Sequence, residues 1–393
     1  MKKKDKRIKE EGFLGRLKMF LSKAYCRLRS FTRQMIGHIG WIMPAFRFLL
    51  HSVIRSEKRI LAIWDFRTVP YSIGDLIIFH ERINILRLTH KVDKADICFV
   101  YEPDKPARKA GLQGVTPDNF HYHFPPLVST VYLTPHIGSF FLFDSHRHLE
   151  EFVADNAGKY YVWPGIKDYI NKYKSYRDNF DFVQDFYRKN GFIPYIDCRA
   201  GTLEWAYTFY KKHVLPDYPV VVHLRNNPRS GAERNACLDA WLKFFKFCEG
   251  KFDVKFIMIG STKEIDNRFR NLPNVLISKD YATTVEKDAV LAYSSLIDLG
   301  ISSGLSAMVY FSQTPYIMFN YRLAHENLPH GENFPFATEL QKLVWIPETT
   351  EILIEEFSKL FPRVSKTDWR EKMDKFMASR SGETFQSHLL WSE

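Results

Sequence analysis

The sequence predicts an α/β protein that contains two doubly wound parallel sheets and begins with a basic helical arm. Short apolar strand segments alternate with segments of helix length, and this alternation occurs on both sides of residue 216. The strand segments are apolar and often β-branched, as expected for strands buried on both faces of a sheet. With 393 residues, the chain is long enough for two domains, each with its own core.

The positive charge of the chain is concentrated in its first residues. Residues 1–59 contain 16 Lys and Arg against four Asp and Glu, whereas the rest of the chain contains 40 against 41. A hydrophobic content of 45% excludes a disordered chain. Nucleic-acid binding through the basic arm is an alternative, but the neutral body lacks the usual basic and aromatic motifs, so we expect no nucleic-acid partner.

Residues 1–58 are predicted to form a basic amphipathic arm. Apolar residues recur there at helical spacing, with Lys and Arg between them. The segment is not a secretory signal, because no uninterrupted apolar core follows its long basic region. His38, Pro44 and Arg47 interrupt its most apolar stretch before about 20 residues accumulate, so we expect no clear membrane span.

The composition of this arm suits the surface of an anionic membrane. The sequence therefore predicts a peripheral membrane contact through residues 1–55. A pair of helices that packs on the body or on a partner is the alternative. The five scattered cysteines form no disulfide or zinc motif and indicate a reducing compartment.

Residues 59–215 are predicted to form the first domain. A strand at 59–64, a turn ending in Ser72-Ile73-Gly74-Asp75, a helix at 76–88 and a strand at 96–101 give a βαβ unit. Residues 102–135 are rich in Pro and Gly and are predicted to be a long irregular loop carrying His121 and His123. The remaining elements expected here are helices at 147–154, 177–190 and 203–213, and strands at 160–163 and 192–196.

Residues 216–361 are predicted to form the second domain, and residues 362–393 a helical tail. The expected strands lie at 220–223, 254–260, 274–277, 296–301 and 316–319. The expected helices lie at 235–248, 284–293, 305–311 and 350–360.

The strand at 220–223 ends in His223-Leu224-Arg225. A ligand of an open α/β sheet lies beyond the carboxyl ends of the strands, where Arg225 is expected. Its guanidinium is a fixed cationic fork that suits a diphosphate; a salt bridge at a domain boundary is the alternative. His223 points inward after three valines, and is either a ligand contact or a hydrogen-bonded core histidine.

The strand at 296–301 is followed by Ser302-Ser303-Gly304. Hydroxyls, backbone N–H groups and a residue without a side chain at the start of a helix are the ingredients of an anion site. Ordinary helix capping by serine is the alternative. Together with Arg225 from another strand, this turn is predicted to form a two-sided clamp for phosphate.

Two α/β halves with anion-binding features in the second resemble the GT-B fold, in which two Rossmann-like domains face a cleft. The segment from Val220 to Arg225 resembles the strand and His-x-Arg motif of the α-1,6- and protein O-fucosyltransferases. The segment from Asp298 to Gly304 is similar to the Asp…Ser-Ser segment of that group. The first strand with its Gly74-Asp75 turn resembles the heptosyltransferases of lipopolysaccharide synthesis. The chain also resembles uncharacterised bacterial glycosyltransferases of surface polysaccharides.

The resemblance implies a metal-independent glycosyltransferase with a nucleotide-sugar as co-substrate, no further cofactor, and a GDP-sugar as the favoured donor. Its acceptor would be a cell-surface glycan, lipopolysaccharide or glycolipid, and its place the cytoplasmic face of the inner membrane of a bacterium. No Asp-x-Asp motif occurs in the chain. A catalytically silent scaffold of a glycan-assembly complex is the alternative.

The resemblance also assigns roles to residues. Arg225, Ser302, Ser303 and Gly304 would bind the donor phosphates. Asp75 would be the catalytic base, unless it only caps a helix. Alternative candidates for the base are Asp65, Asp144, His121 and His136. Candidates for further donor contacts are His223, Arg229 and Arg234. Candidates for contacts to the ribose are Glu326 and Glu332.

Overall fold

The computed structural model describes residues 58–104, 114–165, 176–227, 232–322 and 328–381. Apart from Lys58, the predicted arm lies outside these ranges, and so do Arg229 and Glu326. The predicted domain boundaries stay predictions. None of the helices within the described ranges is long and apolar enough to span a membrane.

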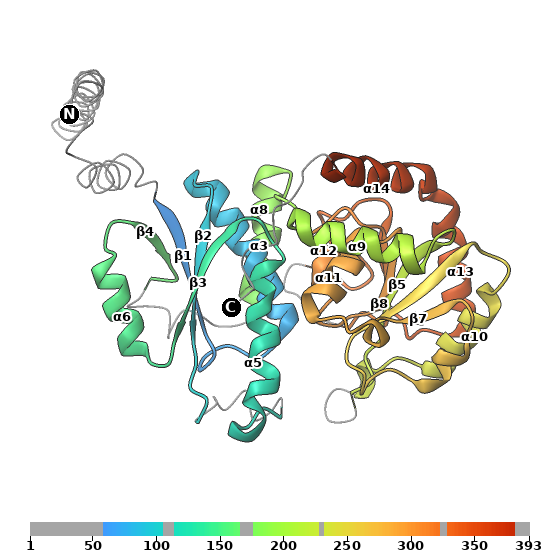
Figure 1. Ribbon diagram of the computed structural model, residues 1–393, viewed down its shortest axis with the longest axis horizontal. Coiled ribbons are helices and arrows are strands. Elements are labelled where there is room, and N and C mark those ends of the chain that lie inside the picture. Colours follow the sequence, from blue (N-terminus) through green and yellow to red (C-terminus); the bar gives the residue numbers. More distant parts are fainter. Residues whose placement is uncertain (1–57, 105–113, 166–175, 228–231, 323–327, 382–393) are drawn as a thin grey trace, which may run out of the picture. The chain divides into compact units, whose positions relative to one another are not determined.

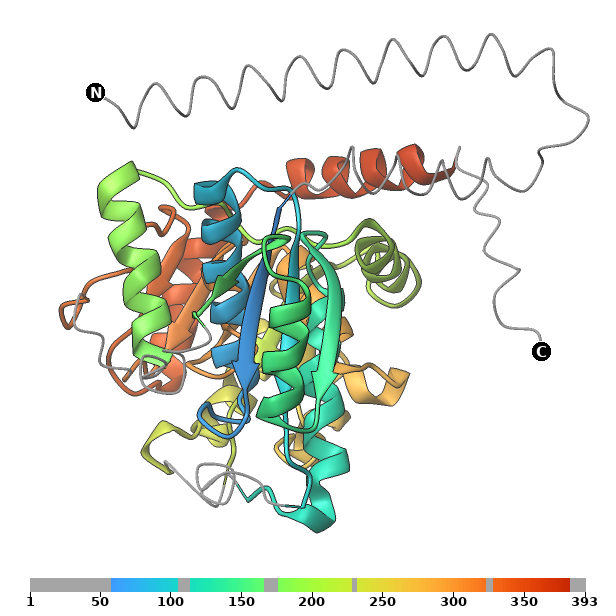
Figure 2. The ribbon, with the colours of Figure 1, turned by 90° about the vertical axis from the view of Figure 1, so that its left-hand side faces the viewer.

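The first sheet consists of parallel strands in the order β3-β2-β1-β4. Their bounds are β1 (Arg59–Asp65), β2 (Ala95–Val100), β3 (Ile137–Phe143) and β4 (Tyr160–Trp163). Helix α3 (Ile73–His90) connects β1 to β2, and α6 (His146–Asp155) connects β3 to β4. Figure 1 shows this sheet beside α3, and Figure 2 shows α6 over its near face.

Alternation along β1 explains why helices cover both faces of this sheet. Ile60, Ala62 and Trp64 belong to the core that contains residues of α3. Leu61 and Ile63 belong to a second core together with Leu149 of α6. Successive side chains of a strand point to opposite faces, so a strand that is apolar throughout needs cover on both.

The predicted irregular loop at 102–135 is wrong in part. It contains α5 (Phe120–Val128), flanked by 3₁₀ turns at Pro117–Asn119 and Ser129–Tyr132. Phe120, Phe124 and Leu127 recur at helical spacing and pack into the core of the first sheet, which outweighs the prolines within the helix. His121 and His123 are therefore exposed residues of a helix rather than of an extended segment.

Two strand assignments within residues 59–215 were also wrong. Strand β3 was not predicted, and the predicted strand at 192–196 is absent from the described structure. The backbone of 192–196 is held by other groups: Asn84 Nδ2 donates to the Pro194 carbonyl at 2.8 Å, and Ile196 N donates to the Phe311 carbonyl at 2.8 Å. An extended apolar segment thus lies outside the sheet because helices supply its hydrogen-bond partners.

The second sheet consists of parallel strands in the order β10-β9-β8-β5-β6-β7. Their bounds are β5 (Tyr218–His223), β6 (Val254–Ile259), β7 (Val275–Ile277), β8 (Ile297–Ile301), β9 (Tyr316–Phe319) and β10 (Gln341–Leu343). Strand β5 pairs with β6 on one side and with β8 on the other. The strands at 220–223 and 296–301 are therefore neighbours, which brings their carboxyl ends together.

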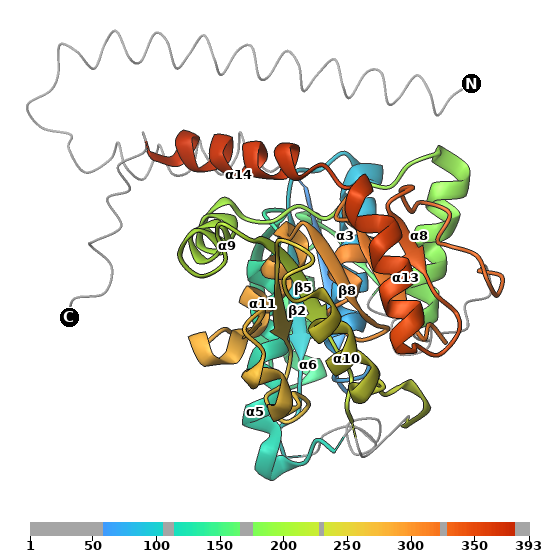
Figure 3. The same cartoon turned by 90° about the vertical axis from the view of Figure 1, so that its right-hand side faces the viewer.

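Helices also cover both faces of the second sheet. Val220 and Val222 face α10 (Leu238–Cys248) and α13 (Thr350–Leu360), and Figure 3 shows these helices in front of β5 and β8. Val221 faces the core that contains residues of α11 (Val285–Ser294) and α12 (Ala307–Tyr310). The other helices are α8 (Tyr176–Asn190), α9 (Ala200–His213) and α14 (Lys366–Ser381).

Candidate functional site

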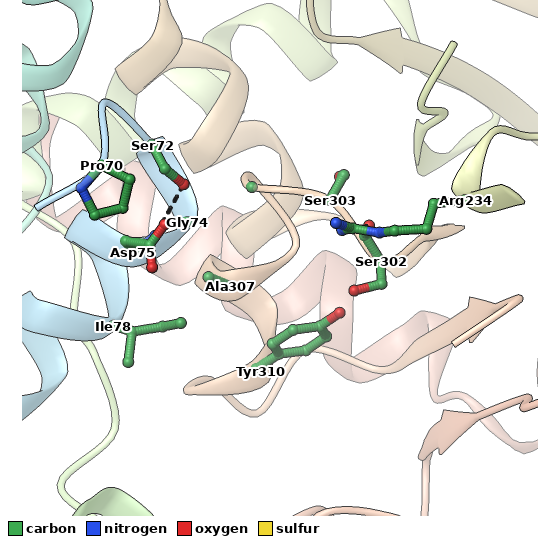
Figure 4. A pocket seen from close by; sticks show the side chains of 11 residues that line it. Pro70, Ser72, Gly74, Asp75, Ile78, Arg234, Ser302, Ser303, Ala307 and Tyr310 are labelled. Atoms are coloured by element: carbon green, nitrogen blue, oxygen red, sulfur yellow. Dashed lines mark hydrogen bonds between the residues drawn. The ribbon is translucent and has the colours of Figure 1, made fainter. Parts of the chain in front are cut away.

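A cavity of about 340 Å³ lies where the start of α3 meets the turn after β8 (Figure 4). Both places follow the carboxyl end of a parallel strand, β1 in the first sheet and β8 in the second. The lining residues are Pro70, Ser72, Gly74, Asp75 and Ile78 from the first half, and Arg234, Ser302, Ser303, Gly304, Ala307 and Tyr310 from the second. The predicted clamp turn and the predicted base therefore share one cavity.

Ser72, rather than Asp75, is the N-cap of α3. The Ser72 hydroxyl accepts a hydrogen bond from the Asp75 backbone N–H at 3.4 Å, as a capping serine does. Asp75 lies in the first turn of the helix, is 9% exposed and lines the cavity. Ser72 therefore caps the helix in place of Asp75, and the Asp75 carboxylate lies beside the cavity.

Gly74 and Gly304 bring the two halves of the cavity wall into close contact. A Cβ atom on Gly74 would lie 2.9 Å from the Cα atom of Gly304, and one on Gly304 would lie 3.1 Å from the Gly74 nitrogen. Any side chain at either position would separate the start of α3 from the Ser302-Ser303-Gly304 turn. Glycine is needed here for the close approach of two backbones.

Arg234 is the arginine that lines the cavity. It ends the 3₁₀ turn Ala232–Arg234, and its Nη2 donates to the Ser302 carbonyl at 2.9 Å. Figure 4 shows its side chain extended towards Ser302 and Ser303. Reciprocal hydrogen bonds between Asn227 and Asn235, at 3.0 and 2.9 Å, hold the chain on either side of this turn.

Arg225 lies beside Arg234, although it is not among the cavity-lining residues. Burial, and then the charge of Arg234, lower the pKa of Arg225, whereas Glu264 and Glu233 oppose this shift. Glu264 follows β6 and also accepts a hydrogen bond from the Asn226 backbone N–H. The sequence interpretation missed Glu264; its place after the strand next to β5 was the signal that could have found it.

His223 and Ser303 are in direct contact. The Ser303 hydroxyl oxygen lies 2.5 Å from His223 Nδ1 and 3.2 Å from the hydroxyl oxygen of Ser306. Burial is the main cause that lowers the pKa of His223 to about 4, from an ordinary 6.5. The imidazole is therefore neutral at neutral pH. His223 is a hydrogen-bonded buried residue that reaches the cavity through Ser303.

Tyr310 is one of the residues that line the cavity. Burial raises the pKa of this phenol, and the hydroxyls of Ser302 and Ser306 partly oppose the shift. Tyr310 is consequently a neutral hydrogen-bond donor at neutral pH. Ile78 and Ala307 are apolar side chains that line the cavity with it.

The other candidate residues lie elsewhere. Asp65 accepts hydrogen bonds from the backbone N–H and Nε of Arg67, both at 2.9 Å, and Asp144 pairs with His148 at 2.8 Å. Glu332 is exposed and does not line the cavity. Neither His121 nor His136 lines it. In the described ranges, no three His, Cys, Asp or Glu side chains gather as ligands for a metal ion.

Two parallel sheets with a cavity at the carboxyl ends of their strands are the architecture of the GT-B fold. Among solved structures, the ADP-heptose lipopolysaccharide heptosyltransferase II of Escherichia coli is 11% identical, with a TM-score of 0.51, and the match covers 78% of this chain and 99% of that one. This likeness confirms the predicted fold class.

Two other solved structures are similar with lower scores. A family 9 glycosyl transferase from Veillonella parvula is 11% identical over 82% of this chain and 98% of its own, with a TM-score of 0.46. The fucosyltransferase NodZ from Bradyrhizobium is 13% identical over 65% of this chain and 94% of its own, with a TM-score of 0.30. No family model and no curated protein sequence matches the chain.

Proposed function

We propose that this protein is a glycosyltransferase that moves a sugar from a nucleoside-diphosphate sugar to a glycan or lipopolysaccharide acceptor. The observation that carries the proposal is the single cavity that joins a carboxylate, Asp75, to an arginine and a Ser-Ser-Gly turn from the other sheet. The GT-B fold and the heptosyltransferase that shares it support this choice of reaction.

The second half of the cavity would hold the donor diphosphate. Arg234 supplies a fixed positive charge, and the Ser302 and Ser303 hydroxyls supply hydrogen bonds to phosphate oxygens. Arg225 adds a second cation beside Arg234. When the bond between the anomeric carbon and the phosphate oxygen breaks, negative charge develops on the leaving diphosphate. Cations already in place stabilise that charge, so the reaction needs no metal ion for this purpose.

Asp75 would act on the acceptor. As the acceptor oxygen attacks the anomeric carbon, its proton transfers to the Asp75 carboxylate. Ile78 and Tyr310, which also line the cavity, would contact the sugar. Proton acceptance on one wall and charge stabilisation on the other are the two tasks of glycosyl transfer from a diphosphate.

A ligand-binding screen tests this proposal. The melting temperature of the wild-type chain is measured with ADP, GDP, UDP, CMP and their sugars, because a ligand that binds only the folded state raises it. We expect one nucleoside diphosphate and its sugar to raise it. Substituting Arg234→Ala should remove the shift, whereas Arg147→Ala, at an exposed surface arginine, should keep it.

The same screen also shows which outcomes would contradict the proposed nucleotide site. Stabilisation that is equal in wild type and Arg234→Ala would place the nucleotide elsewhere. No stabilisation by any of these ligands would contradict the proposal. The screen contains both the GDP-sugar that the sequence favours and the ADP-sugar of the similar heptosyltransferase, so it also distinguishes these two donors.

We further propose that residues 1–55 attach the protein to the cytoplasmic face of an anionic membrane. The support is the excess of Lys and Arg in this segment. The full chain should sediment with vesicles that contain phosphatidylglycerol but not with neutral phosphatidylcholine vesicles, and salt should weaken the binding. Equal binding to both kinds of vesicle would contradict the electrostatic part of the proposal.

A further inference from the structure

We propose that His223 is a positioning residue whose Nδ1–H holds the Ser303 hydroxyl so that its proton is available to a donor phosphate. The inference rests on the proposed function for the identity of the ligand. It rests on the geometry around His223 for everything else. His223 itself does not line the cavity, so its effect must pass through Ser303.

The hydrogen-bond chain around Ser303 favours one direction for each proton. The Ser306 hydroxyl donates to the Ile301 carbonyl at 3.4 Å, because a carbonyl oxygen can only accept. Tyr310 also interacts with Ser306, and its phenolic O–H can donate to that hydroxyl. Ser306 is then the acceptor in its 3.2 Å contact with Ser303. The single Ser303 proton then points towards Ser306, which makes His223 Nδ1 the donor in the 2.5 Å contact with Ser303.

This arrangement leaves the Ser303 proton ready for an anion. Its partner in the ligand-free protein is a neutral hydroxyl, and a phosphate oxygen is a stronger acceptor. Rotation about the Cβ–Oγ bond moves the proton from Ser306 to the phosphate while the imidazole keeps its own bond to the oxygen. In the opposite tautomer, the Ser303 proton would be bound to His223 and unavailable.

The packing around the imidazole holds it in place. A Cβ on Gly260 would lie 2.9 Å from His223 Nε2, and Gly260 has φ +113°, a conformation that side chains disfavour. A Cβ on Gly300, in the neighbouring strand β8, would lie 2.5 Å from the His223 carbonyl oxygen. Two glycines thus leave just enough space for this side chain and its backbone.

The charged groups that face His223 compensate one another. They are Asp288 of α11 and Lys279 of the 3₁₀ turn Ser278–Tyr281, and these two form an ion pair at 2.8 Å. Asp288 also accepts hydrogen bonds from the Gly260 N–H, Ser278 and Thr283. The carboxylate is therefore engaged by other donors, and Ser303 is the hydrogen-bond partner of the imidazole.

The test uses calorimetric titration of the full-length protein with ADP and with GDP, together with amide variants that mimic each ring nitrogen. The Asn side chain places an N–H near the position of Nδ1, and Gln places one near Nε2. We expect His223→Asn to bind within about threefold of wild type, and His223→Gln and His223→Leu to bind about tenfold more weakly, as for a lost hydrogen bond to a charged group. His121→Asn, at an exposed histidine, serves as the control.

A double-mutant cycle separates positioning from general damage to the fold. In the Ser303→Ala background, His223→Leu should cause no further loss of binding, because its effect passes through the missing hydroxyl. Losses that add in the double variant, or His223→Asn as weak as His223→Gln, would overturn the inference while leaving the proposed function intact. Failure of the wild type to bind either nucleotide or any other ligand of the screen would overturn the proposed function, and the inference with it.

The imidazole ¹⁵N chemical shifts of the ligand-free protein give a readout that needs no ligand. The His223 signals, identified by their loss in His223→Asn, should be those of the Nδ1–H tautomer. Signals of the Nε2–H tautomer would overturn the inference whatever the nucleotides do.

Discussion

Asp75 shows how the role of a single residue depends on its neighbour. A carboxylate at the start of a helix is commonly a cap, but the Ser72 hydroxyl makes the capping bond here. Asp75 is thus left beside the cavity opposite Arg234 and the serine turn. A carboxylate at this place can accept the proton of an acceptor hydroxyl.

Replacing Asp75 by Asn should separate catalysis from donor binding. The amide keeps the shape of the side chain but is a far weaker base, so we expect sugar transfer to fall by about 10²- to 10⁴-fold. Nucleotide binding, measured by calorimetry, should stay within about threefold of wild type. Asp118→Asn, at an exposed aspartate of the turn Pro117–Asn119, should leave both measurements unchanged. Full transfer activity in Asp75→Asn would exclude the base role.

At the scale of the elements, the decisive contact is the one between the start of α3 and the turn after β8. Gly74 and Gly304 meet backbone to backbone, and a backbone cannot rotate away as a flexible side chain can. The separation of the two walls of the cavity therefore depends on the absence of side chains at two positions.

The Gly74→Ala substitution should destabilise the protein and weaken nucleotide binding. Its new Cβ would lie 2.9 Å from the Gly304 Cα, and we expect a loss of about 1–3 kcal/mol in the free energy of unfolding, typical of overpacking. The matched control is Gly201→Ala in α9, where a Cβ would meet no atom within 4 Å. This control should be neutral or gain about 0.5–1 kcal/mol. Urea unfolding measures the stability of both variants. Equal stabilities would contradict the close contact between Gly74 and Gly304.

At the scale of the whole molecule, buried histidines couple stability to pH. Burial lowers the pKa of His80 on α3 to about 3 and that of His223 on β5 to about 4, from 6.5. Between these values and 6.5, the unfolded chain binds protons that the folded chain does not. Each histidine therefore contributes stability above pH 6.5 that is lost as the pH falls. Buried Glu81 and Asp298, whose pKa values burial raises, act in the opposite direction.

A comparison between variants isolates the histidine contribution from that of the acids. His80→Gln keeps a polar group near Thr130 but cannot titrate. Relative to wild type, this variant should gain about 3 kcal/mol in its free energy of unfolding between pH 8 and pH 4, because it no longer loses stability through this site. His121→Gln should show no such gain. A difference between His80→Gln and wild type that does not change with pH would contradict a buried, neutral His80.

The sequence by itself determined the fold class, because apolar runs of strand length that alternate with helical segments can be buried only in covered parallel sheets. It also determined that β5 and β8 carry polar turns at their carboxyl ends. It did not find β3, β10 or α5. Strand β3 is a half-exposed edge strand, and β10 has three residues. The prolines in and around α5 masked the helical spacing of its phenylalanines.

Only the tertiary structure decided which residues meet. Strand order made β5 and β8 neighbours, and so joined His223 to Ser303 across 80 positions of sequence. The packing of Gly74 against Gly304 brought Asp75 to the same cavity, and the chain after β5 put Arg234 on its wall with Arg225 beside it. Local sequence fixes backbone preference and the pattern of burial, whereas distances between residues far apart in the chain depend on how the sheets and helices pack.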